Sequence, residues 1–186
     1  MVVAVFGGSF DPPHIGHAMV AQWVLLTGQA REVWLVPTVA HALKERGLSP
    51  YPDRCEWADR MAYAIDGNRV VVSTIEETLP QPSYMHTTLV TLAEQWPDVE
   101  FRLLIGSDIL SETYRWHRWE DIEERFNPIV ANRASFKLPY QPPVFPNINS
   151  TAIRRHLRRK EKGLLTHLVP KAVLDVLPTS SAYWLR

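Results

Sequence analysis

Short apolar runs alternate with amphipathic segments along this chain, and that alternation constrains the fold more than any other feature of the sequence. The first run, residues 1–6 (MVVAVF), is rich in valine and stops at Gly7 and Gly8, which is typical of a buried strand that ends in a tight turn. Further strands are predicted at residues 32–37, 70–73, 101–105 and 128–131, and helices at about 17–26, 53–65, 84–95 and 119–126. This order indicates an α/β protein with a mainly parallel sheet and helices on both faces.

The chain is predicted to form one domain, residues 1–186. A length of 186 residues, with 46% hydrophobic and 22% charged residues, is typical of one globular domain with its own core. Asp53 is the predicted N-cap of the helix that follows it. A basic helix is predicted at about 150–160 and a short helix at 170–177, so we expect a small C-terminal helical segment beginning at about residue 150.

The charge balance and the single cysteine limit the partners and the compartment. Twenty basic and 20 acidic residues give a net charge of zero, which argues against a surface for nucleic acid. Cys55 cannot form an internal disulfide, and the sequence shows neither a signal segment nor an apolar run long enough to span a membrane. We therefore expect a cytoplasmic protein with no membrane partner, and the sequence leaves a homo-oligomer open.

The segment that joins the first strand to the first helix carries the strongest chemical signal. It reads GGSFDPPHIGH over residues 7–17, and a strand-to-helix turn is where backbone N–H groups and the helix dipole attract phosphate. The segment matches neither a P-loop nor the dinucleotide motif GxGxxG. His14 and His17, three residues apart around Gly16, could both face one phosphate chain; metal ligation and two plain surface histidines are the alternatives.

A second anion-binding group is predicted near the C-terminus. The sequence NSTAIR, residues 149–154, begins a predicted helix and offers hydroxyl groups, backbone N–H groups and Arg154 one turn later. Two such groups in one chain suggest a triphosphate ligand. The alternative is that Ser150 only caps the helix while Arg154 and its neighbours form a solvated face.

One long connection is also a candidate for function. Residues 38–52 are polar and irregular, and a loop of this length without its own structure is commonly functional in a compact domain. We therefore expect it to cover a substrate.

Five segments in a fixed order resemble the bacterial nicotinate-nucleotide adenylyltransferases. They are GGSFDPPHIGH at residues 7–17, PSY followed by Thr88 and Leu89, IGSD at 105–108, WHRW at 116–119, and STAIR at 150–154, with HLVP at 167–170 resembling the family's ending. The first motif alone marks only the wider nucleotidyltransferase superfamily. The ordered set covers nearly the whole chain.

The resemblance implies a Rossmann-like, doubly wound fold and a reaction in which ATP and nicotinate mononucleotide give deamido-NAD and pyrophosphate. Mg²⁺ accompanies the ATP, and no protein residue is expected to ligate it. The acceptor's phosphate oxygen attacks the α-phosphorus in line, so the protein needs only to position both substrates and to stabilise negative charge.

The resemblance also assigns residues to roles. His14, His17 and Arg154 are the implied catalytic residues. The implied ATP-binding residues are Gly7, Gly8, Ser9, Phe10, His14, Gly16, His17, Gly106, Asp108, Ile148, Ser150, Thr151 and Arg154. The implied acceptor-binding residues are Asp11, His41, Lys44, Ser83, Tyr84, Met85, Trp116 and Arg133.

The chain departs from the family pattern mainly on the acceptor side. His41 and Lys44 stand three apart where the family commonly has them adjacent, Met85 and His86 replace a threonine and a small or apolar residue, and Asn149 replaces a serine. Nicotinamide mononucleotide, phosphopantetheine or another nucleoside triphosphate therefore remain alternative substrates. A non-enzymatic nucleotide sensor is the alternative of another class, and a dinucleotide hydrolase would need an acidic metal site that the sequence does not show.

Overall fold

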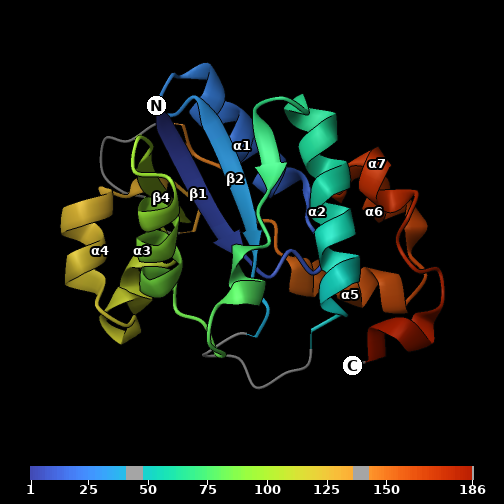
Figure 1. The fold of residues 1–186 in the computed structure, drawn as a ribbon. Helices are drawn as coiled ribbons and strands as arrows, with labels where there is room; N and C mark the ends of the chain where they lie inside the picture. The colour runs from blue at the N-terminus through green and yellow to red at the C-terminus, as the bar shows by residue number, and fades with distance from the viewer. Residues whose placement is uncertain (41–47, 136–142, 186) are drawn as a thin grey trace.

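A computed structural model of the chain describes residues 1–40, 48–135 and 143–185. In these residues five strands form one sheet in which every pair is parallel, with the order β3-β2-β1-β4-β5 (Figure 1). The strands are β1 (Val2–Gly8), β2 (Glu32–Pro37), β3 (Val70–Val72), β4 (Glu100–Gly106) and β5 (Ile129–Ala131). The parallel sheet predicted from the alternation is confirmed.

The strand order places a topological switch point between β1 and β4. The chain runs outward from β1 through β2 to β3 and then returns to β4 on the other side of β1. Because consecutive crossovers are right-handed, this reversal puts the two sets of helices on opposite faces and opens a crevice at the carboxyl ends of β1 and β4. A ligand is therefore expected beyond Gly8 and Gly106.

Helices cover both faces of the sheet, as the sequence predicts (Figure 1). The α-helices are α1 (Ile15–Leu26), α2 (Tyr51–Asp66), α3 (Met85–Gln95), α4 (Trp119–Phe126), α5 (Ser150–Arg158), α6 (Lys162–Leu168) and α7 (Lys171–Leu174). Three 3₁₀ helices are η1 (Ile75–Thr78), η2 (Leu110–Arg115) and η3 (Ser181–Leu185).

The core has two halves, one on each face of the sheet. Ala4 of β1 belongs to the half that α1, α2 and the C-terminal helices cover, whereas Val3 and Val5 belong to the half under α3 and α4. These three residues are fully buried. Burial on both faces explains why the central strand reads as a continuous apolar run rather than as an alternation of apolar and polar residues.

Three details of the sequence prediction are wrong. The last short helix, predicted at 170–177, covers only Lys171–Leu174. Asp53 does not cap α2, because the helix begins at Tyr51 with Pro50 as N-cap, and the Asp53 carboxylate accepts a hydrogen bond from the Tyr183 hydroxyl instead. The basic helix ends at Arg158 rather than continuing to 160, because Lys160 has a φ of 57°, and the separate helix α6 follows. No helix in the described ranges is long and apolar enough to cross a membrane.

Candidate active site

A pocket of about 590 Å³ lies at the carboxyl ends of β1 and β4. Its size is that of a small-molecule site. Most of the predicted site residues line it: Gly7, Gly8, Ser9, His14, Gly16, His17, Ser83, Tyr84, Met85, Gly106, Asp108, Trp116, Arg133, Ile148, Ser150, Thr151 and Arg154. Phe10 and Asp11 are buried beside it, and His41 and Lys44 lie outside the described residues.

The N-termini of three helices meet at this pocket. The N-cap residues of α1, α3 and α5 are His14, Tyr84 and Asn149, and all three line the pocket. None of the three helices has an acidic residue in its first turn. Free N–H groups and the positive end of a helix dipole favour an anion, so the pocket is built for a ligand or ligands with several negative groups.

His14 and His17 form a stacked pair at the start of α1. Their ring centroids lie 3.6 Å apart with an angle of 22° between the planes. The His14 backbone N–H donates a hydrogen bond to Nδ1 of His17 over 3.1 Å, which places the ring proton of His17 on Nε2 as a donor. Gly16 gives the His14 ring its room, since a Cβ at Gly16 would lie 3.0 Å from Nδ1 of His14.

Desolvation keeps both imidazoles neutral at neutral pH. Desolvation, with a smaller contribution from the Arg133 guanidinium, lowers the pKa of His14 from 6.5 to about 3. Desolvation also holds the pKa of His17 well below its usual value, with His14 and Arg133 adding to the shift. The pair therefore offers N–H donors without charge at neutral pH, and an incoming polyanion would favour protonation.

Phe10 supports this pair from behind. The residue has a φ of 46°, is 1% exposed, and its ring centroid lies 5.0 Å from that of His17 and 5.9 Å from that of Phe6. Its ring fixes the position of His17 rather than lining the pocket, and a direct contact with ATP stays a prediction.

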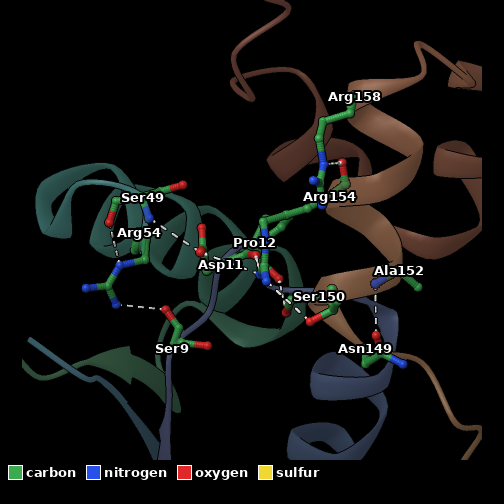
Figure 2. Close-up of polar contacts among 11 residues, drawn as sticks. Ser9, Asp11, Pro12, Ser49, Arg54, Asn149, Ser150, Ala152, Arg154 and Arg158 are labelled. Atoms are coloured by element: carbon green, nitrogen blue, oxygen red, sulfur yellow. Dashed lines mark hydrogen bonds and ion pairs between the residues drawn. The ribbon is translucent and has the colours of Figure 1, made fainter. Parts of the chain in front are cut away.

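Helix α5 is tied to the turn at the end of β1 (Figure 2). The Ser150 hydroxyl donates to the carbonyl of Pro12 over 2.8 Å, and Nη1 of Arg154 donates to the carbonyl of Asp11 over 2.6 Å. The Asp11 carboxylate lies 3.5 Å from the same guanidinium. The two motifs, more than 130 residues apart in sequence, thus form one side of the pocket, residues 7–17 and 149–154. We call it the triphosphate side, after the ligand expected from the sequence.

The N-cap residue of α5 differs from the one that the sequence analysis considered. Asn149 accepts a hydrogen bond from the backbone N–H of Ala152 over 2.9 Å and is the N-cap residue. Ser150 lies in the first turn of α5, and its hydroxyl group points back to Pro12. The alternative in which Ser150 only caps the helix is therefore wrong.

Arg54 of α2 also holds the turn, and the sequence analysis missed it. The side chain is 1% exposed and donates hydrogen bonds to the carbonyl groups of Ser9 over 2.8 Å, Ser49 over 2.9 Å and Val39 over 3.5 Å (Figure 2 shows the first two). The Ser49 N–H faces the Asp11 carboxylate at 3.4 Å. An arginine in a charged helical stretch carries no signal of such burial.

Gly106 and Asp108 follow β4 on the far side of the switch point. A Cβ at Gly106 would lie 2.2 Å from Oδ1 of Asp108, so only glycine lets the carboxylate approach the backbone this closely. Arg133 after β5 lies 3.5 Å from the Asp108 carboxylate and donates to the carbonyl of Ile148 over 2.7 Å. Its predicted contact with an acceptor phosphate stays a prediction.

A second part of the pocket lining is formed by residues 83–86 at the start of α3 and residues 115–117 at the end of η2. We call it the acceptor side, after the ligand expected from the sequence. The ring of Tyr84 lies 4.9 Å from that of His117, and His86 pairs with Asp121 over 2.6 Å. The methyl group of Met85 lies over Gly7, where a Cβ would be 2.2 Å away. The sequence analysis missed His117 and Glu76 as lining residues and gave His86 no role.

Among the described residues, no group of three or more His, Cys, Asp or Glu side chains could hold a metal ion.

Comparisons with known proteins agree on one group. The family model described as Cytidylyltransferase-like matches residues 5–156. Two relatives share the name "Probable nicotinate-nucleotide adenylyltransferase". The protein of Anaeromyxobacter sp. (strain K) is 37% identical, with 97% of this chain and 96% of the relative covered. The protein of Myxococcus xanthus (strain DK1622) is 33% identical, with 99% and 95% covered.

A solved structure has the same fold. The nicotinic acid mononucleotide adenylyltransferase of Plasmodium falciparum, complexed with NaAD, superimposes with a TM-score of 0.77 over 94% of this chain and 93% of that chain, at 18% identity.

Proposed function

The chain belongs to the nicotinate-nucleotide adenylyltransferases within the cytidylyltransferase-like family, and from this premise we propose how its pocket carries out their reaction. The enzyme transfers AMP from ATP to nicotinate mononucleotide and yields deamido-NAD and pyrophosphate, a step of NAD biosynthesis. Its location in the cytoplasm stays a prediction.

The observation that carries the proposal is the meeting of three helix N-termini at one pocket. Two of them, those of α1 and α5, belong to the triphosphate side, where the hydrogen bonds from Ser150 and Arg154 join them. The third, that of α3, stands on the acceptor side. The negative groups of the two substrates match these two sides. ATP carries a triphosphate, and the acceptor carries a phosphate and a carboxylate.

On the triphosphate side the groups needed for transfer are hydrogen-bond donors. In the reaction, an oxygen of the acceptor's phosphate bonds to the α-phosphorus while the bond to the β-phosphate oxygen breaks, and pyrophosphate leaves with that electron pair. Nε2–H of His17, the ring of His14 and the guanidinium of Arg154 would donate to the phosphate oxygens on which negative charge gathers. Fixed donors of this kind stabilise the transition state without a covalent intermediate.

On the acceptor side the start of α3 suits a carboxylate. Tyr84, the N-cap residue, supplies no side-chain hydrogen bond to the first turn, which leaves backbone N–H groups at Met85 and His86 for a ligand. Trp116 lines the pocket, and its ring forms a T-shaped pair with that of Trp119 with centroids 5.8 Å apart. In the proposed complex the Trp116 ring would stack on the pyridine ring. This arrangement favours nicotinate over nicotinamide, whose amide carries no charge.

Mg²⁺ is part of the proposal as a companion of ATP. The donors of the triphosphate side, N–H groups and a guanidinium, suit phosphate oxygens. The ion itself would be held by the phosphates, where it lowers their negative charge.

The test is an assay of the purified protein with ATP, Mg²⁺ and one acceptor at a time: nicotinate mononucleotide, nicotinamide mononucleotide or phosphopantetheine. Pyrophosphate release and product mass are measured together. We expect pyrophosphate and the mass of deamido-NAD with nicotinate mononucleotide. Folded protein that binds ATP but releases pyrophosphate with none of the three would contradict the proposal.

A further inference from the structure

Glu76 is a buried acidic residue in the pocket wall, outside the two motifs at residues 7–17 and 149–154. It lies on η1, is 2% exposed and lines the pocket. Oε2 accepts hydrogen bonds from the Ser83 hydroxyl over 2.7 Å and from the Val39 N–H over 3.1 Å, and Oε1 accepts one from the Thr88 hydroxyl over 3.4 Å. One carboxylate thus joins the chain beyond β2 to the loop before α3 and to α3 itself.

The backbone of Glu76 holds the same loop. Nε2 of Gln81 donates to the Glu76 carbonyl over 2.7 Å, and Oε1 of Gln81 accepts from the Ser83 N–H over 3.3 Å. The residues that lead into α3 are therefore fixed at both their side chains and their backbone.

This arrangement keeps a charged group where burial disfavours it. Burial raises the pKa of Glu76 above its usual value, while the hydrogen bonds from Ser83, Val39 and Thr88 oppose that shift. A carboxylate that is removed from water is stable only if such donors satisfy it. The buried Glu76 carboxylate thus needs its three hydrogen-bond donors, and the carboxylate in turn holds those donors in place.

The side chain just ahead of α3 is turned toward the Glu76 carboxylate. The Ser83 hydroxyl donates to Glu76, and Tyr84, the N-cap residue of α3, makes no side-chain hydrogen bond to the first turn. The first N–H groups of α3 therefore have no side-chain cap, and Glu76 fixes the segment that leads into them.

We propose that Glu76 is a positioning residue for the acceptor: it holds Ser83 and Thr88 so that the N-terminus of α3 stays open to the acceptor's carboxylate. This inference rests on the proposed function and deepens it. Glu76 itself does not touch the carboxylate, which like charge would disfavour; it acts through the backbone of α3.

The first test compares Glu76→Gln with the matched control Glu77→Gln, since Glu77 is the next residue on η1 and is exposed. We expect E76Q to raise KM for nicotinate mononucleotide by about tenfold, the usual effect of losing hydrogen bonds to a charged group. KM for ATP and kcat should stay within about twofold, because the triphosphate side is unchanged. E77Q should behave as the wild type.

A second test shows whether Glu76 acts through Ser83. Ser83→Ala alone should raise KM for nicotinate mononucleotide, and the double variant E76Q/S83A should be no worse than E76Q, because both changes break the same hydrogen bond. Fully additive effects on KM would contradict the inference. S83A also keeps the inference testable if E76Q does not fold.

The outcomes separate the inference from the function it rests on. Wild-type protein that makes no deamido-NAD would contradict the proposed function. Active wild type whose E76Q variant keeps its KM for nicotinate mononucleotide, or raises the KM of both substrates equally, would overturn the role of Glu76 alone.

Discussion

The triphosphate side and the acceptor side of the pocket are built in different ways. The first is formed by two short motifs, residues 7–17 and 149–154, that touch each other directly through Ser150 and Arg154. The second is assembled from several separated segments around the carboxylate of Glu76. In the proposed mechanism the chemistry thus rests on local motifs, whereas the choice of acceptor rests on long-range packing.

The two sides also differ in charge. On the triphosphate side the imidazoles of His14 and His17 are neutral because desolvation lowers their pKa values. On the acceptor side three hydrogen-bond donors stabilise the buried carboxylate of Glu76. The triphosphate side offers uncharged N–H donors to the phosphate groups of ATP. The acceptor side offers the uncapped N-terminus of α3 to the acceptor's carboxylate. Substitutions on the two sides should therefore affect different kinetic constants.

The largest effect is expected for His17→Ala. The variant removes a donor that acts as charge develops, and loss of one such donor lowers kcat by about 10²–10³-fold. ATP affinity should change by only a few-fold, because the interaction strengthens in the transition state. Steady-state rates and ATP binding by calorimetry measure the two quantities. The exposed His167→Ala is the control, and a variant with near wild-type kcat would refute the role of His17.

Arg154→Met is expected to act on the same side with a smaller effect. Its guanidinium lines the pocket and is anchored on the Asp11 carbonyl, so its loss should lower kcat/KM for ATP by about 10–100-fold. KM for the acceptor should stay nearly constant. The exposed Arg155→Met serves as control. An equal rise in KM for both substrates would contradict the division into two sides.

The buried His14 should also make the stability of the fold depend on pH. His14 has a folded pKa of about 3, below its unfolded value of 6.5, so the unfolded chain takes up a proton first as the pH falls. Stability is therefore lost below pH 6.5, by about 1 kcal/mol for His14 between pH 7 and pH 5.5. Denaturant unfolding at both pH values should show this loss, and His14→Gln should show less of it. An equal loss in the variant would contradict the assignment.

The smallest effect is expected for Met85→Thr on the acceptor side. If backbone N–H groups of α3 hold the carboxylate, the side chain at this position matters little, and KM for nicotinate mononucleotide should change by less than about threefold. KM for ATP should not change. A tenfold change in the acceptor's KM would show that the side chain, and not the backbone, reads the acceptor.

The contrast between the two sides explains which parts of the fold and the site could be predicted from the sequence. Strand and helix order follows from local periodicity, and the anion-binding turns follow from contiguous motifs, so the fold and the triphosphate side were predicted. Glu76, Arg54 and His117 were not, because each owes its position to contacts with distant segments. The N-cap role of Asp53 failed for the same reason, since Tyr183 from the C-terminal segment binds its carboxylate. The predicted roles of His41 and Lys44 stay predictions.

The measurement that tests the account most directly is the ratio of kcat/KM for nicotinate and nicotinamide mononucleotides, determined side by side with the same enzyme and ATP, with product masses confirmed. Because the N-terminus of α3 favours a carboxylate over an uncharged amide, the account predicts a preference of at least about tenfold for nicotinate. Equal or reversed values would contradict the claim that this helix N-terminus selects the acceptor.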